Sequence, residues 1–294
     1  MEFIPAKNIV SGYSKSSGWF GCEYNMNIYK GCSHGCIYCD SRSECYQIDD
    51  FSRVRAKEDA ITTIEKNLRS KRQKGVIGTG GMSDPYNPQE KKHELTRGAL
   101  KLIDKYRFGV SPLTKSNLVL RDIDIIKKIS MHSPVNVMMT ITTFDDILSR
   151  KIEPNVCPSS ERFRAIKEFS DAGIYAGILL MPILPFIEDT KENIVNIIAL
   201  AKKNDARFIY PSFGMTLRLN QREYYYEKLD KLFPGLSNKY ISLYGDSYGC
   251  NSPKAYELKS LFKSECIKSG ITFSMSEIIN GYKKGYITKQ LSWI

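Results

Sequence analysis

Short apolar segments alternate with longer amphipathic segments along most of the chain. The apolar segments are rich in Val, Ile and Tyr and nearly continuous in apolar character, which is typical of strands buried on both faces. They predict six strands, at residues 26–30, 75–78, 108–113, 135–142, 174–183 and 206–213. The segments between them have helical periodicity and predict helices at residues 58–70, 91–106, 118–130, 159–172 and 191–203.

The order of these elements predicts the fold class, which is α/β. Strand–helix alternation at this spacing implies parallel strands joined by right-handed crossovers. Six such units are too few to close an eightfold barrel, so we expect a partial (β/α)6 barrel of the TIM type. In these folds the chemistry lies at the carboxyl ends of the strands, so the loops that follow the strands are the candidates for function.

The pattern changes after about residue 215. Two segments with helical patterns, residues 221–233 and 252–270, flank a stretch that is rich in turn residues. A chain of 294 residues is also long for a single core. We therefore expect a core with an N-terminal lead-in over residues 1–215 and a small, mostly helical C-terminal extension over residues 216–294.

Composition and charge narrow the class of protein only slightly. Hydrophobic residues make up 42% and charged residues 26%, as in ordinary soluble domains. No apolar run is long enough to span a membrane and the N-terminus lacks a signal-peptide pattern, so we expect a cytoplasmic protein without membrane association. The net charge of +11 favours anionic partners such as nucleic acid, although the scattered lysines are explained as simply by a solvated basic surface.

Three of the eight cysteines lie close together in one loop. Cys32, Cys36 and Cys39 have the spacing C-x3-C-x2-C, and a glycine precedes each of the first two. In a reducing compartment such clustering indicates metal rather than disulfides. Three thiolates at this spacing can hold three irons of a cubane 4Fe–4S cluster, which leaves the fourth iron open to a ligand.

Two other interpretations of these cysteines are open. A structural zinc ion would need a fourth ligand, and His34, Cys45 and Cys22 are the candidates. The odd x3 gap fits zinc poorly, because structural zinc sites usually show paired CxxC spacing. The cysteines could also be buried reduced thiols, but their position in a glycine-flanked loop speaks against a packing role.

The cysteine motif resembles that of the radical S-adenosylmethionine (SAM) superfamily. Tyr38 stands before the last cysteine, as an aromatic residue does in that family, and the motif follows the first strand of a six-unit βα run. The resemblance covers about residues 20–215. It implies an oxygen-sensitive enzyme whose open iron chelates SAM, and which cleaves SAM to methionine and a 5′-deoxyadenosyl radical. It also implies an external electron donor such as a flavodoxin or ferredoxin.

Two loops at strand ends carry residues suited to holding SAM. Gly80 and Gly81 permit close approach of the backbone to a ligand, and Ser83 and Asp84 can accept hydrogen bonds from an ammonium group. A simple turn explains the same residue types. Lys115, after the third strand, can pair with a carboxylate, although a solvated lysine is the more usual case.

Two threonines mark the end of the fourth predicted strand. Thr140 and Thr142 share one face of a strand that continues through both, because side chains alternate with a period of two. If that face is the barrel interior, their hydroxyls reach the cofactor; ordinary β-propensity explains them as well. The family resemblance implies that all these loop residues, together with Tyr38, bind SAM.

The order of several motifs is similar to that of one branch of the superfamily, the spore photoproduct lyase-like proteins. The matching pieces are GCSHGCIYC, MSDPY, HELTRGAL, LTKSNLVLRD, TITT, Glu153-Pro154, Arg162 and DAGIYAGILLMPI. The lyase of this branch repairs a thymine dimer in DNA. This chain has Gly81 where the lyase has a cysteine that donates a hydrogen atom, and Asp40 where the lyase has a tyrosine.

The substrate and the reaction class stay open at this point. The leading hypothesis is a radical SAM enzyme that abstracts hydrogen from an unidentified substrate, as a lyase, a transferase or an oxidoreductase. A DNA photoproduct lyase is the alternative within the superfamily. An alternative of another class is a metal-binding module without catalysis that associates with nucleic acid, although such a module would not need a large parallel barrel.

Overall fold

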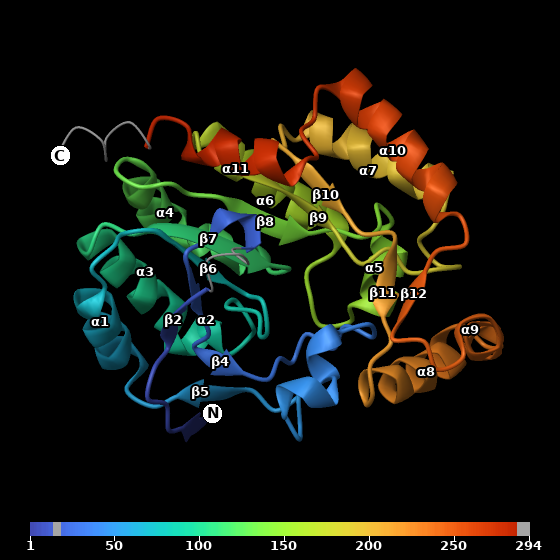
Figure 1. The fold of residues 1–294 in the computed structure, drawn as a ribbon, viewed down its shortest axis with the longest axis horizontal. Coiled ribbons are helices and arrows are strands. Elements are labelled where there is room, and N and C mark those ends of the chain that lie inside the picture. Colours follow the sequence, from blue (N-terminus) through green and yellow to red (C-terminus); the bar gives the residue numbers. More distant parts are fainter. Residues whose placement is uncertain (14–18, 287–294) are drawn as a thin grey trace.

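A curved sheet of seven strands runs through the centre of the computed structural model, which describes residues 1–13 and 19–286 (Figure 1). The strand order is β10-β9-β8-β7-β6-β3-β2. The bounds are β2 Val10–Gly12, β3 Tyr24–Met26, β6 Val76–Thr79, β7 Gly109–Thr114, β8 Val137–Thr140, β9 Ala176–Leu180 and β10 Ile209–Pro211. Strands β3 and β6 to β10 are mutually parallel, and β2 pairs antiparallel with β3 at one edge. Six parallel strands in an open sheet confirm the predicted partial barrel.

Amphipathic helices cover the outer side of this sheet, as Figure 1 shows. Those that connect the parallel strands are α1 Ala60–Ser70, α3 Leu95–Lys105, α4 Ile123–Ser130, α6 Ser159–Asp171 and α7 Lys191–Lys203. The helix predicted at 91–106 is interrupted: Glu94 adopts a left-handed φ of 48°, which separates α2 (Glu90–His93) from α3. The first half of the helix predicted at 118–130 is the 3-10 helix η4, Asn117–Asp122. Helix α5, Asp146–Ile152, was not predicted.

The first predicted strand, residues 26–30, is wrong as a single element. The chain leaves the main sheet after Met26 and forms β4, Tyr29–Lys30, in a small separate sheet. That sheet also holds β1, Glu2–Ile4, and β5, Arg55–Lys57. The cysteine loop, residues 31–39, therefore follows β4 rather than the parallel strand β3, and the backbone of Cys32 donates a hydrogen bond of 2.7 Å to the Phe51 carbonyl.

The C-terminal part is mostly helical, as predicted. Up to residue 286 it contains an antiparallel strand pair, here called the hairpin, made of β11 Gly214–Thr216 and β12 Gly249–Asn251 with two helices between them, and four helices: α8 Gln221–Leu232, α9 Leu236–Tyr244, α10 Ala255–Ser269 and α11 Met275–Lys283. Helix α10 packs on α7, while α8 and α9 lie beside the hairpin (Figure 1). The expected boundary after residue 215 falls inside β11, and the division into two domains stays a prediction. Residues 287–294 of the predicted extension lie outside the described residues.

The hydrophobic residues form two main cores. The larger core fills the space between the sheet and helices α1, α3, α4, α6, α7 and α10. The second core joins Ile37 and Tyr38 of the cysteine loop to the hairpin, α8 and α9. None of the helices in the described parts of the chain is long and apolar enough to cross a bilayer.

Candidate active site

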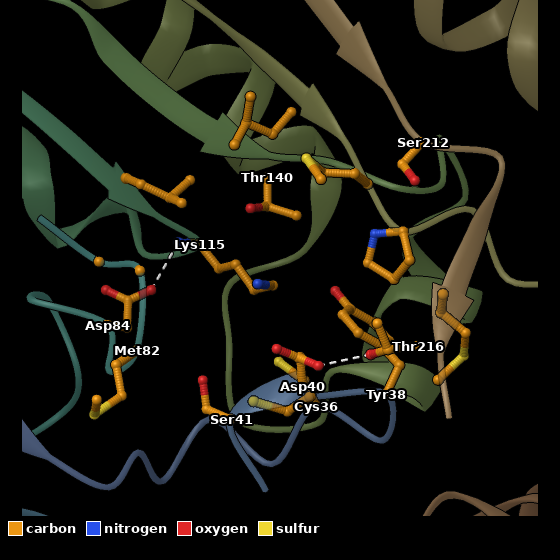
Figure 2. Close-up of a pocket in the computed structure, with 18 of the residues that line it drawn as sticks. Cys36, Tyr38, Asp40, Ser41, Met82, Asp84, Lys115, Thr140, Ser212 and Thr216 are labelled. Carbon is orange, nitrogen blue, oxygen red and sulfur yellow. Dashed lines mark hydrogen bonds between the residues drawn. The ribbon is translucent and has the colours of Figure 1, made fainter. Parts of the chain in front are cut away.

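A cavity of about 670 Å³ opens at the carboxyl ends of the parallel strands. The cysteine loop lines one side, and the end of β8 and the loops after β6, β7, β9 and β10 also line the cavity. Figure 2 shows Cys36, Asp84, Lys115 and Thr140 arranged around this space. Its volume is that of a pocket for a drug-sized ligand, which is enough for a nucleoside-based cofactor.

The three clustered cysteines all line this cavity. Burial raises the pKa of the Cys32 thiol to about 12, and it also raises the pKa values of Cys36 and Cys39. Such thiols ionise at neutral pH only when metal cations compensate the charge of the thiolates. A set of three sulfur ligands on one loop, two buried and one half-buried, all open to one cavity, fits the iron–sulfur cluster that the sequence predicts.

Of the three candidates for a fourth zinc ligand, His34 lines the same cavity with its Nδ1 3.4 Å from Asp84, whereas Cys22 and Cys45 have other surroundings. Cys22 packs against Val76 and Tyr282 in a separate hydrophobic cluster. Cys45 is exposed, and its sulfur lies 3.3 Å from an Arg218 nitrogen. Within residues 1–13 and 19–286, no three His, Cys, Asp or Glu side chains are grouped as ligands of one metal ion. This result applies to the three clustered cysteines as well, so the preference for a cluster over zinc rests on the cysteine spacing.

Tyr38 is held by a buried charge network behind the cysteine loop. Its hydroxyl donates a hydrogen bond to Glu153 Oε1, and Arg162 Nη1 lies 2.6 Å from the other oxygen of the same carboxylate. Arg162 also donates to the backbone carbonyls of Thr140 and Cys157, at 3.0 and 2.9 Å. The network therefore links the cysteine loop to the end of β8 and to helix α6.

Both carboxylate oxygens of Asp84 already accept hydrogen bonds from other groups of the protein. Its Oδ1 accepts hydrogen bonds from the Thr114 hydroxyl at 2.7 Å and from the Tyr86 amide at 2.8 Å. Its Oδ2 accepts from the Lys115 amide at 2.9 Å, and His34 Nδ1 lies 3.4 Å away. Asp84 lines the cavity, yet the geometry makes it the residue that ties the loop after β6 to the end of β7.

Lys115 extends its side chain into the cavity (Figure 2). The Nζ atom lies 5.7 Å from the centre of the Tyr38 ring, and in the described part of the chain no carboxylate lies within ion-pair distance of it. Burial lowers the pKa of Lys115, but the charges of Cys36 and Glu153 outweigh that effect and leave the pKa above its usual value. The side chain is therefore a half-buried ammonium that an anionic ligand group can reach.

The two glycines of the predicted loop differ in their surroundings. A Cβ on Gly80 would lie 2.0 Å from the Leu113 carbonyl oxygen, and its φ is +91°, so only glycine fits there. A Cβ on Gly81 would meet nothing within 4 Å. Both residues line the cavity, so Gly80 is needed for the loop's path and Gly81 leaves room for a ligand.

Two of the predicted SAM contacts lie away from the cavity. Thr140 lines it, but β8 ends at this residue, so the alternation that would place Thr142 on the same face does not continue. Thr142 is buried, and its backbone carbonyl accepts a hydrogen bond from Asn193. Ser83 is also buried and faces a small enclosed space on the other side of its loop, lined in addition by Asn27 and Thr79.

Several residues that sequence reasoning did not select also line the cavity. They are Asp40, Ser41, Met82, Thr114, Ser212, Thr216 and Asn251. Asp40 and Ser41 follow the last cysteine directly, so proximity in sequence was an available signal for them. Thr216 of β11 and Asn251 of β12 lie on paired strands. Both are far in sequence from the cysteine motif and from the loops after β6 and β7, so only the fold brings them to the cavity.

Comparison with known proteins gives a consistent picture. The profile of the Radical SAM superfamily matches residues 26–201. An uncharacterized protein of Methanocaldococcus jannaschii is 37% identical over 173 residues, which are 58% of this chain and 64% of that protein. An uncharacterized protein of Mycobacterium tuberculosis is 27% identical over 231 residues, 76% of this chain and 67% of that protein. The match thus spans slightly less than two thirds of the first relative's length.

Solved structures of spore photoproduct lyase have the same fold. One, of a variant enzyme, superposes with a TM-score of 0.66 and 14% identity and covers 92% of this chain and 82% of the lyase chain. Another, in complex with dinucleoside spore photoproduct, has a TM-score of 0.64 and 15% identity and covers 90% and 79%. At this level of identity the likeness establishes the fold.

Proposed function

The chain belongs to the radical SAM superfamily, whose members use a 4Fe–4S cluster and SAM, and from this premise we propose that it is a hydrogen-abstracting radical enzyme. When bound, the cluster and SAM supply a 5′-deoxyadenosyl radical by one-electron reduction of SAM, with methionine as the second product. The electron would come from an external donor such as a flavodoxin or ferredoxin. The observation that carries the proposal is the convergence of Cys32, Cys36 and Cys39 with Lys115 on one cavity.

The cavity residues would divide the work as follows. The three thiolates would hold the cluster, and the Lys115 ammonium, 5.7 Å from the centre of the Tyr38 ring, would pair with the SAM carboxylate. The glycine loop, residues 80–84, would leave room for the cofactor beside its backbone, since Gly81 adds no side chain there. Asp84 acts indirectly, because its oxygens already accept hydrogen bonds from Thr114 and the Lys115 amide and so hold that lysine's backbone in place.

Anaerobic reconstitution with iron and sulfide, followed by reduction with dithionite in the presence of SAM, tests this proposal. We expect 5′-deoxyadenosine to form in the wild type and to be absent in Cys36→Ala. Cys266→Ala is a matched control, because Cys266 is a buried thiol of α10 in the larger core. SAM cleavage by Cys36→Ala at the wild-type rate would refute the proposal.

Repair of a DNA photoproduct is the second candidate function, and a feature of the cavity bears on it. The described cavity lining contains no cysteine besides the three proposed ligands. Cys250, beside the lining residue Asn251, turns its side chain into the second core instead. A repair reaction would therefore need another hydrogen donor for the product radical. UV-irradiated DNA, incubated with reduced enzyme and SAM, decides this: restored thymines would support repair, and intact photoproducts together with SAM cleavage would exclude it.

The substrate is otherwise open, and deuterium transfer identifies it. Candidate nucleic acids, peptides and metabolites carrying deuterium are incubated with reduced enzyme and SAM. The true substrate class transfers deuterium into 5′-deoxyadenosine, because the radical takes its hydrogen atom from the substrate carbon. A metal-binding module without catalysis would give no 5′-deoxyadenosine with any of them and would contain metal all the same.

A further inference from the structure

The segment that follows β11 is joined to the cysteine loop by several polar contacts. Figure 2 shows the first: the Thr216 hydroxyl donates a hydrogen bond of 2.6 Å to Asp40 Oδ1, beside Cys39. The other oxygen of the same carboxylate lies 3.3 Å from Arg218 Nη1 and accepts a hydrogen bond from the Tyr46 hydroxyl at 3.0 Å. Both oxygens of Asp40 are thus engaged, two of their three partners being in residues 216–218.

Gln221 makes a second connection from the same segment. Its side chain is fully buried, and its Nε2 donates a hydrogen bond of 3.0 Å to the Tyr38 carbonyl. Its Oε1 accepts from the Arg218 amide at 3.2 Å and lies 2.9 Å from the Thr216 hydroxyl. Because buried amides and carbonyls are costly to leave without partners, this geometry fixes the backbone on either side of Cys39.

Apolar contacts also join the cysteine loop to the segment that follows β11. Cys36, Ile37 and Tyr38 belong to the second hydrophobic core, whose other buried members include Leu217 and Tyr225. The cysteine loop therefore packs on the C-terminal segment and not only on the barrel. A third polar contact closes this surface, since the Glu44 amide donates a hydrogen bond of 3.1 Å to the Leu219 carbonyl.

The same hairpin also forms a wall of the cavity. Gly214, Met215 and Thr216 of β11 and Asn251 of β12 line it, opposite Lys115 and Thr140 (Figure 2). Thr216 has one hydroxyl hydrogen, and the short contact to Asp40 takes it. The Thr216 oxygen can then only accept further hydrogen bonds, and its bond to the Asp40 carboxylate makes it a stronger acceptor. It would present this acceptor to a substrate in the cavity.

We propose that Thr216, Arg218 and Gln221, here called the clamp, are positioning residues for the iron–sulfur cluster. They hold Tyr38–Asp40, and with it Cys39, against the wall of the substrate cavity. This inference rests on the proposed function, because it concerns the cluster that the three cysteines would hold. It means that the C-terminal segment completes the cofactor site and connects the substrate wall to the cluster loop.

The release of iron from reconstituted protein to a ferrous chelator under anaerobic conditions tests the clamp. We expect Thr216→Val to lose iron about tenfold faster than wild type, because a hydrogen bond to a charged group next to Cys39 is gone. Thr216→Ser keeps the hydroxyl and should retain the wild-type rate. Thr272→Val makes the same chemical change at a half-buried threonine beside β10, far from the loop, and should leave the rate unchanged.

Two further measurements separate positioning from general stability. The electron paramagnetic resonance spectrum of the reduced cluster should change in Thr216→Val and be restored in Thr216→Ser, while the thermal midpoint of the metal-free chain serves as the check on folding. Amide hydrogen exchange on the wild type needs no variant: loading the cluster should slow exchange in residues 216–222 as well as in the cysteine loop.

The clamp proposal would be wrong if Thr216→Val left iron release and the spectrum unchanged, or if cluster loading did not alter amide exchange in residues 216–222. Neither result would contradict the proposed function. A wild-type chain that takes up no iron would instead overturn the proposed function, and the clamp with it. The two failures are therefore distinguishable in one set of samples.

Discussion

Arg162 Nη1 lies 2.6 Å from Glu153 Oε2, and both side chains are almost completely buried, with 0% and 1% of their surfaces exposed. Removing one partner leaves an uncompensated buried charge. We expect Arg162→Met to destabilise the fold by about 3–5 kcal/mol. The double variant Glu153→Leu/Arg162→Met, which removes both charges, should cost clearly less. Urea unfolding of the metal-free chains measures both, and a double variant as unstable as the single one would contradict the ion-pair account.

The two neighbouring glycines of the loop after β6 should respond differently to the same substitution. Gly80→Ala places a Cβ 2.0 Å from the Leu113 carbonyl oxygen and strains a φ of +91°, so we expect lost SAM binding and a loss of stability of several kcal/mol. Gly81→Ala meets open space and should fold like the wild type. Equal thermal midpoints for the two variants would show that the loop does not follow the described path.

Much of the fold was predictable because buried parallel strands leave a clear pattern. The predicted helix at 191–203 has the bounds of α7, where the Thr190 hydroxyl accepts a hydrogen bond from the Asn193 amide and fixes the helix start. The first strand was misplaced because residues 26–30 read as one apolar run, whereas pairing of β4 with β5 in another sheet decides where the run breaks. Pairing partners distant in sequence leave no local signal.

The candidate site was predictable where chemistry is local and less so where it depends on the fold. Nine of the eleven residues predicted from the cysteine spacing and from their position at strand ends line the cavity. The order of the strands is therefore enough to place most of the predicted residues at the cavity. Thr142 does not line the cavity, because β8 ends two residues earlier. Thr216 and Asn251 were missed because they reach the site through the pairing of β11 with β12, and helices α8 and α9 separate these two strands in the sequence.

Ser83 offers a test of the enclosed space behind the glycine loop. Ser83 Oγ, Thr79 Oγ1 and Asn27 Oδ1 are buried without a hydrogen-bond partner among the described residues, and all three residues line a space of about 10 Å³. That volume holds about one water molecule, so we expect an ordered water bonded to these atoms in a crystal structure. Ser83→Ala should cost about 1 kcal/mol of stability, whereas Ser260→Ala on the exposed face of α10 should cost almost nothing. Equal stability of the two variants would argue against the water.

Glu188 should make stability depend on pH. Burial raises the pKa of Glu188 from 4.5 to about 8. Between these values the folded chain keeps the proton and the unfolded chain loses it, so stability falls as pH rises, by up to about 1.4 kcal/mol per pH unit. Relative to Glu188→Gln, the wild type should therefore lose stability from pH 5 to pH 8 and level off above that. Urea unfolding across this range measures it, and a pH-independent difference would contradict the assignment.

The central claim is that Cys32, Cys36 and Cys39 hold one 4Fe–4S cluster with an iron open to SAM. Electron paramagnetic resonance of the dithionite-reduced, reconstituted protein, recorded before and after addition of SAM, tests it most directly. We predict the spectrum of one reduced 4Fe–4S centre that changes when SAM is added, is lost in each of the three Cys→Ala variants and persists in Cys45→Ala. A spectrum that SAM leaves unchanged, or a cluster that survives in Cys39→Ala and is lost in Cys45→Ala, would contradict the account.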